Sequence, residues 1–294
     1  MSELTYQEKP ELIKSALIMA FSGWPNAGEV STGTMNYLFS RLSPKPLACI
    51  DPDLFHDFTE NRPTALIESG RLMQLARPTH AFSYVQGSGG EVDLILFTGS
   101  EPNLRWNLYC DQIERLIREM RVQVVITLGG TYDYVPHWAT PRISAVYSGQ
   151  EAQNLTSPLK DRLQFTQYQG PVSIHTMIQE RVQTVGLPAV SLWGHAPVYI
   201  QTGNVKIHHL LVELLKNLLG FSLDTTELLA DIETMDRQID DLVANNPKLK
   251  KYLEELNQEY QETRRRSEPP RRQPEGQTGG KVISLEEFLK RNEE

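Results

Sequence analysis

Residues 15–28 read SALIMAFSGWPNAG, and this stretch decides the fold. Ser15–Ser22 is a short apolar run, typical of a strand that is buried on both faces. Gly23–Gly28 is a turn. Residues 29–42 then carry apolar side chains at helical spacing on one face, at Val30, Met35, Leu38, Phe39 and Leu42. A buried strand, a turn and a helix in this order are the repeating unit of a parallel sheet.

The same alternation continues outward from this unit as far as residue 219. Further strands are expected at 47–50, 71–75, 82–86, 93–98, 122–128, 143–147, 172–174 and 189–193. Helices are expected at 104–120, 175–185 and 205–219. We expect Gly129-Gly130 to end the strand that precedes it. Continuous apolar strands that alternate with helices predict a mainly parallel sheet covered by helices on both faces.

The C-terminal third follows a different pattern. Apolar residues there are spaced 4-3-4-3 along a heptad seam, which consists of Leu228, Ile232, Met235, Ile239 and Leu242. Asn245-Asn246-Pro247 breaks this helix, and a second apolar stripe runs from Leu249 to Tyr260. The pattern predicts a C-terminal helical hairpin whose seam binds a partner or a second subunit, or caps its own body. We expect domain boundaries of 1–223, 224–262 and 263–294, the last a polar tail with a short helix at Ser284.

Charge and composition exclude several classes of protein. The net charge is −8, which argues against binding nucleic acid through overall positive charge. No apolar run is long enough to span a membrane, and we see no signal peptide. Cys49 and Cys110 lie far apart, so we expect free thiols in the cytoplasm and no structural zinc site. Residues 224–262 hold eleven acidic and four basic side chains, so the hairpin is the acidic part of the chain.

Polar and aromatic residues follow several of the expected strands. Because the carboxyl ends of parallel strands meet at one edge, we expect these residues to lie close together there. They are Gly23, Trp24, Asn26, Asp51, Asp53, Glu101, Arg105, Trp106, His137 and Arg142. This candidate rim site is either an active site or a hydrogen-bonded brace that holds long loops. Asp51, Asp53, His56 and Asp57 are alternatively a divalent-cation site, although turn formation by the aspartates explains them as well.

The signatures of several catalytic and cofactor-binding classes are missing. Gly23 and Gly28 have phosphate-loop spacing, but Glu29 and Val30 follow where lysine and serine or threonine are required. No dinucleotide fingerprint, nucleophile elbow or zinc-protease motif is present. His208-His209 has no second histidine at the spacing that metal binding requires. We therefore expect no cofactor, no metal and weak or absent ATP binding.

Five segments together resemble the proteasome assembly chaperone 2 family. They are 21–28 (FSGWPNAG), 50–58 with Arg62-Pro63, 99–106 (GSEPNLRW), 128–130 with Pro136-His137, and 191–193 with 197–199. The resemblance covers about residues 15–262, and the helical C-terminus is similar to that of bacterial-type members. It implies a three-layer α/β/α sandwich similar to nucleoside phosphorylases and hydrolases.

The same resemblance implies a non-catalytic chaperone or scaffold role, protein partners and a homo-oligomer, with a trimer as the expected size. Members that dock on proteasomes end in a hydrophobic residue, tyrosine and any residue. Asn292-Glu293-Glu294 departs from that pattern, so we do not expect docking of this kind. The alternative function is an enzyme that acts on a small anionic metabolite at the rim, because one fold hosts many functions.

Overall fold

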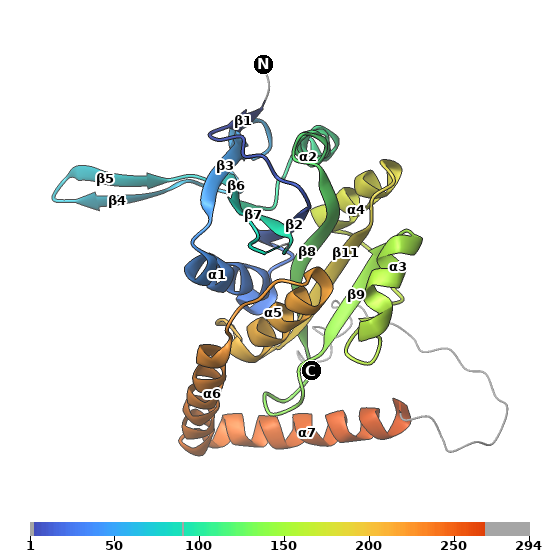
Figure 1. Ribbon diagram of the computed structural model, residues 1–294. Helices are drawn as coiled ribbons and strands as arrows, with labels where there is room; N and C mark the ends of the chain where they lie inside the picture. Colours follow the sequence, from blue (N-terminus) through green and yellow to red (C-terminus); the bar gives the residue numbers. More distant parts are fainter. Residues whose placement is uncertain (1–2, 90, 268–294) are drawn as a thin grey trace.

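The computed structural model describes residues 3–89 and 91–267 and contains a large mixed sheet (Figure 1). Within the described residues, nine strands form this sheet in the order β1-β3-β6-β7-β2-β8-β11-β9-β10. Their bounds are β1 Leu4–Tyr6, β2 Ser15–Ser22, β3 Lys45–Ile50, β6 His80–Val85, β7 Asp93–Ser100, β8 Val122–Asp133, β9 Ile143–Ser148, β10 Gln164–Phe165 and β11 Ala189–Pro197. The four central strands β7, β2, β8 and β11 are parallel, and antiparallel strands flank them.

Helices cover both faces of the sheet, which confirms the predicted α/β/α architecture. The helices of the body are α1 Val30–Leu42, α2 Trp106–Glu119, α3 Gln150–Thr156, α4 Ile174–Thr184 and α5 Val205–Leu219, with short 3-10 turns at Ala27–Glu29, Pro52–Leu54 and Ser157–Leu159. One buried cluster joins the sheet to α2 and α4, and a second joins it to α1, α3 and α5. Apolar strands that alternate between these two clusters explain why β2 is buried along almost its whole length.

One expected strand end and one expected strand are wrong. Gly129-Gly130 does not end its strand, because β8 continues to Asp133. The two glycines serve close packing instead. A Cβ on Gly129 would lie 2.6 Å from the Trp193 ring, and one on Gly130 would lie 2.3 Å from the carbonyl oxygen of Ala27. Residues 172–174 are not a strand: Ser173 caps α4 and its side chain accepts a hydrogen bond from the His175 N–H.

A two-stranded ribbon projects from the body and was only partly predicted. Strand β4 (Thr64–Glu68) was not expected, whereas β5 (Arg71–Ala76) matches a predicted strand. The two strands pair only with each other among the described residues, and every residue in both is exposed. Figure 1 shows the ribbon pointing away from the sheet and its helices.

A β-bulge gives this ribbon one apolar face. The cross-strand pairs include Ala65 with Leu75 and Ile67 with Leu72, and the register shifts between Leu66 and Ile67. Residues two apart on β4 share a face, so Ile67 and Leu72 lie on the same side as Leu75. These side chains are 63%, 58% and 47% exposed, respectively. The opposite face is mixed, with Leu66 paired to Gln74 and Glu68 paired to Arg71.

The two expected C-terminal helices are present as α6 (Thr226–Ala244) and α7 (Pro247–Ser267). The helix α7 continues past residue 262, where we expected the polar tail to begin. Three consecutive arginines, 264–266, lie in this extension, and arginine has a favourable helix propensity. In Figure 1, α6 descends beside α5, and α7 then runs across below the body. The expected short helix at Ser284 lies outside the described residues.

Both C-terminal helices contact the body near the carboxyl ends of the central strands. Lys206, at the start of α5, forms a 2.6 Å ion pair with Asp236 of α6. The Tyr252 ring of α7 lies 6.2 Å from the ring of Tyr199. Of the predicted seam, Leu228 is buried, whereas Ile232, Met235 and Ile239 are half-buried and Leu242 is 64% exposed. The chain therefore covers the start of its own seam and leaves the far end open.

The sheet ends in short strands on both sides. The first, β1, has three residues, and the last, β10, has two residues. Neither of these strands offers a long row of free backbone groups. Within the described residues, no helix is both long enough and apolar enough to span a membrane.

Candidate functional site

The predicted rim residues follow strands whose carboxyl ends lie at one edge of the sheet. Strands β3, β7 and β8 run in the same direction, which places Asp51, Glu101 and His137 beyond the same edge. They do not meet as one constellation. Strand β6 lies between β3 and β7, and β2 lies between β7 and β8. The edge instead carries several separate clusters of polar side chains.

The loop 23–28 is held by the side chain of Asn26. Its Oδ1 accepts hydrogen bonds from the Ser31 N–H at 2.9 Å, the Ser31 hydroxyl at 2.8 Å and the Thr32 N–H at 3.1 Å. The Gly130 N–H donates to the carbonyl of Pro25 at 2.7 Å, which pins the loop to β8. These bonds position the loop and occupy the side-chain oxygen of Asn26. Trp24 is 65% exposed beside it, as an apolar side chain open to a partner.

Asp51 and Asp53 form a local turn. Asp51 Oδ1 accepts a 3.0 Å hydrogen bond from the Asp53 N–H and caps the short helix Pro52–Leu54. Both aspartates are exposed. Within the described residues, no group of three or more histidine, cysteine, aspartate or glutamate side chains is arranged to hold a metal ion. The geometry of the Asp51 side chain is that of a helix cap, and Asp53 takes part through its backbone N–H.

Glu101 connects the edge of the sheet to α4. Its Oε1 accepts a 2.9 Å hydrogen bond from the N–H of Ile174, the first residue of that helix. Burial raises the pKa of Glu101, although the hydrogen bond from Ile174 opposes the shift. Carboxylates are favoured at helix N-termini, so this contact stabilises the start of α4. Arg105 is exposed, and the neighbouring Trp106 donates through Nε1 to the Pro102 carbonyl at 2.6 Å.

His137 is buried at the junction between the body and α6. Its backbone N–H donates to the Tyr199 hydroxyl at 2.5 Å, and its Nδ1 lies 2.8 Å from the same oxygen. Its Nε2 lies 3.6 Å from an Asp240 oxygen, and Lys206 donates to its carbonyl at 2.9 Å. Burial lowers the pKa of His137 despite the nearby carboxylate of Asp240. His137 therefore helps to seat α6 on the body.

Arg142 belongs to a cluster that the sequence did not predict. Its guanidinium pairs with Asp133, the last residue of β8. Asp133 Oδ2 also lies 2.7 Å from His195 Nδ1, and His195 Nε2 lies 2.5 Å from the Ser144 hydroxyl. Burial acts to raise the pKa of Asp133, but the bonds from His195 and Arg142 outweigh it and hold the pKa below its usual range.

A second missed cluster is a buried chain of polar side chains under the same edge. The Tyr109 hydroxyl lies 2.8 Å from His80 Nδ1, and His80 Nε2 lies 2.8 Å from His56 Nε2. The chain ends at Asn103, whose Oδ1 lies 3.3 Å from His56 Nδ1. Asn103 Oδ1 can only accept a hydrogen bond, so His56 Nδ1, His80 Nε2 and the Tyr109 hydroxyl are the three donors along the chain. Each imidazole therefore carries one proton and is neutral. Burial, with the neighbouring His56, lowers the pKa of His80 to about 3.

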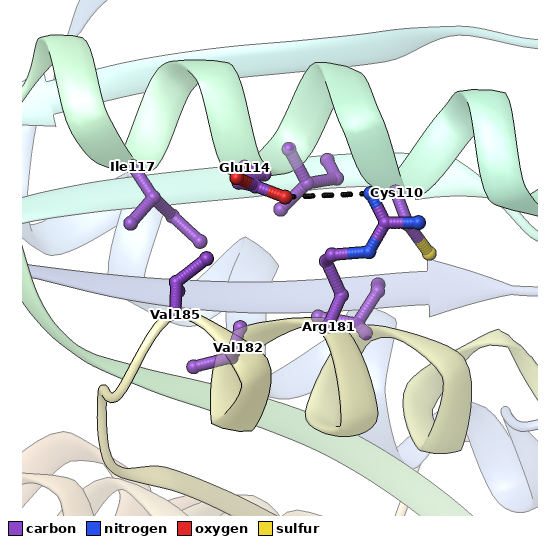
Figure 2. Close-up of a pocket in the computed structure, with 8 residues that line it drawn as sticks. Cys110, Glu114, Ile117, Arg181, Val182 and Val185 are labelled. Carbon is purple, nitrogen blue, oxygen red and sulfur yellow. Dashed lines mark hydrogen bonds and ion pairs between the residues drawn. The ribbon is translucent and has the colours of Figure 1, made fainter.

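Cys110 follows Tyr109 on α2 and lies in the contact between α2 and α4. Figure 2 shows Arg181 of α4 reaching Glu114 of α2, a 3.3 Å ion pair, with Cys110 beside it and Ile117, Val182 and Val185 in the same contact between the helices. The space between the two helices is too narrow to admit even a water molecule, so it holds no ligand site. Burial raises the pKa of the Cys110 thiol to about 12, which leaves it protonated and unreactive.

Comparisons with known proteins identify related chains. The family model described as the PAC2 family matches residues 20–243. A PAC2 family protein from Streptomyces avermitilis is 29% identical, with a TM-score of 0.69 over 78% of this chain and 95% of that chain. A proteasome-assembly chaperone homologue from Mycobacterium tuberculosis is 27% identical, with a TM-score of 0.73 over 81% of this chain and 99% of that chain.

An archaeal proteasome activator from Pyrococcus furiosus shares the fold at 18% identity. Its TM-score is 0.65 over 82% of this chain and 99% of that chain. A search of curated proteins returned no match.

Proposed function

Because the chain belongs to the PAC2 family, we propose that it is an assembly chaperone-like or scaffold protein that acts through protein–protein contacts. A relative described as a proteasome-assembly chaperone homologue supports this role. Glu101, Asn26 and His137 each hold a helix or loop in place, which also supports a binding body over a reaction at these residues. Such a role requires surfaces that bind other chains, and the described residues offer two.

The first surface is the apolar face of the ribbon, which consists of Ile67, Leu72 and Leu75. A two-stranded hairpin is at best marginally stable in water, because it buries little apolar surface on its own. This ribbon buries none of its residues against the body of the chain. A stable ribbon therefore needs a surface from another chain over its apolar face. We assign that surface to a second copy of this protein, which makes the protein a homo-oligomer, with a trimer as the expected size.

Adding negative charge to the apolar face tests whether a second copy of the protein packs on it. The double substitution Ile67→Glu with Leu72→Glu places two carboxylates where the second copy would pack, so we expect the oligomer to dissociate to monomers. Multi-angle light scattering measures the particle mass directly. The matched control is Leu66→Glu, since Leu66 is 51% exposed on the same strand but lies on the opposite face.

The control should keep the wild-type particle mass. If the double variant also keeps that mass, the apolar face does not join subunits. If Leu66→Glu dissociates the particle equally, the contact does not depend on the face that the bulge creates.

The second surface is the open end of the C-terminal seam at Leu242. The acidic side chains of α6 surround it, which favours a partner with a basic surface. We expect Leu242→Glu to reduce the amount of partner protein that co-purifies from native extract, measured by quantitative mass spectrometry. Leu229→Glu is the control, because Leu229 is 50% exposed on the same helix but lies outside the seam. Equal recovery of partners with Leu242→Glu and with wild type would contradict a role for the seam.

A further inference from the structure

A hollow lies between the body of the chain and the second half of α7. It has a volume of about 430 Å³, within the range of about 300 to 1,000 Å³ that ligand sites occupy. Its apolar side chains come from the start of β9 and the loop before it, from the segment that leads into β10, and from α5 and α7. They are Pro141, Ile143, Leu163, Leu210 and Tyr260. The hollow therefore offers an apolar surface and room for several side chains of a partner.

Charges of both signs lie at the rim of this hollow. Arg142 pairs with Asp133, so its charge is already balanced within the body. Arg162 and Asp161 line the hollow next to each other in the chain, and both are exposed. Among the described residues, neither of these two forms an ion pair. A partner that fits this surface has an apolar face with charged side chains of both signs beside it.

One segment of this chain has that pattern. Residues 282–291, beyond the described part of the chain, read VISLEEFLKR. Leu285, Phe288 and Leu289 have the i, i+3, i+4 spacing of one helix face, and the order Ser284 to Glu287 is a capping box that opens a helix. Two glutamates, a lysine and an arginine supply charges of both signs. An amphipathic helix that lies in an apolar groove is a recurrent mode of recognition.

The chain also tethers this segment close to the hollow. Tyr260 lies seven residues before Ser267, the last residue of α7, and seven helical residues span about 10 Å. The seventeen residues 268–284 then separate α7 from Leu285. A chain of that length without fixed structure spans about 20 to 25 Å on average. The segment can therefore return to the hollow without stretching, at an effective concentration on the order of millimolar.

We propose that residues 282–291 dock as a helix in the hollow of their own chain, with Leu285, Phe288 and Leu289 against its apolar side chains. A weak contact is enough, because the tether replaces binding from solution. The docked segment holds the second half of α7 against α5 and β9, whereas the first half contacts the body through Tyr252. This contact goes beyond the proposed binding function and does not depend on it.

Cross-linking of two native lysines in the full chain tests the docking. Lys160 is exposed and directly precedes Asp161 of the rim, and Lys290 belongs to the segment. A lysine-reactive cross-linker should join the two, and peptide mass spectrometry should identify the pair. We expect the pair in the single-chain band of a denaturing gel. Its presence only in the two-chain band would assign the segment to a second copy and overturn the proposal.

A substitution on the apolar face of the segment gives the sharper comparison. Phe288→Glu should lower the yield of the Lys160–Lys290 link about 10-fold or more, because it removes an apolar anchor and adds a charge. The matched control is Ile283→Glu, which adds the same charge but precedes the Ser284 cap and lies outside the i, i+3, i+4 face. The control should keep the wild-type yield. Equal yields for Phe288→Glu and wild type would contradict the docking.

Hydrogen–deuterium exchange of the full chain provides a second readout. The amides of 282–291 should exchange about 10-fold more slowly in wild type than in Phe288→Glu, because docking fixes them in a helix. Equal and fast exchange in both proteins would overturn the proposal. Light scattering on Phe288→Glu should give the wild-type mass, since the ribbon is untouched, and this separates the result from the oligomer test.

Discussion

Acidification from about pH 7 to about pH 4.5 is expected to lower the free energy of unfolding by several kcal/mol. Three buried histidines are the cause. Burial lowers the pKa of His175 to about 3, and that of His80 to about 3 with help from His56. Burial lowers the pKa of His208 to about 4, although its bond to Glu29 opposes the shift. Both ring nitrogens of His175 lack a hydrogen-bond partner among the described residues, so nothing nearby stabilises its charged form.

The sign of the effect follows from proton binding. Each of these side chains binds a proton near pH 6.5 when the chain is unfolded, but only near pH 3 to 4 when it is folded. Between these limits the unfolded state holds more protons, so stability is lost as the pH falls. Each histidine contributes about 1.4 kcal/mol per pH unit in that window, or about 2 to 3 kcal/mol at about pH 4.5.

Adjacent histidines on α5 provide the control. His208 is buried, whereas His209 is half-buried on the same helix. His208→Gln should reduce the difference in unfolding free energy between the two pH values by about 2 to 3 kcal/mol, and His209→Gln should leave it unchanged. Urea unfolding at both pH values measures the difference. An identical pH dependence in wild type and His208→Gln would show that His208 does not contribute.

Phe21→Ala is expected to destabilise the protein by about 3 to 5 kcal/mol, because it leaves a large cavity where several elements meet. Phe21 is fully buried in β2, and its ring lies 4.9 Å from that of Phe97 and 5.4 Å from that of His175. These neighbours lie on β7 and α4, so no single element can relax to fill the space. Urea unfolding should show a lower midpoint at an unchanged slope.

Ile13→Ala is the matched control for this cavity. Ile13 is also a large apolar residue and lies two residues before β2, but it is 80% exposed. Its removal should change the unfolding free energy by less than about 0.5 kcal/mol. A loss below about 1 kcal/mol for Phe21→Ala would mean that the neighbouring side chains collapse into the cavity.

The sequence predicts the elements that are held by local and periodic patterns. The expected helix 205–219 matches α5, and the expected strand 15–22 matches β2, because continuous apolar residues and a glycine stop are local signals. The prediction that Gly129-Gly130 ends its strand was wrong, because these glycines leave room for the Trp193 ring and the carbonyl oxygen of Ala27. Those groups come from other elements and are not adjacent in the chain.

The candidate site shows the same limit. The sequence predicts that Glu101 and His137 follow strands, and both lie beyond one edge of the sheet. It does not predict that Glu101 caps α4 or that His137 seats α6, because both contacts join residues far apart in the chain. Ser144, His195 and Asp133 carry no shared local motif, so their alignment depends on the order β8-β11-β9. Strand order is a property of the whole fold and cannot be read from any one segment.

The short strands at the two sides of the sheet limit how the molecule can polymerise. Fibres that grow by backbone pairing need a long, flat edge on which the next molecule can continue the sheet. Here the outermost strands have three and two residues, and such edges are poor templates for growth. The subunit contacts that we propose through side chains of the ribbon would instead give an assembly of finite size when the rotation between neighbours closes a ring. The edges of the nine-stranded sheet are therefore poor sites for open-ended growth.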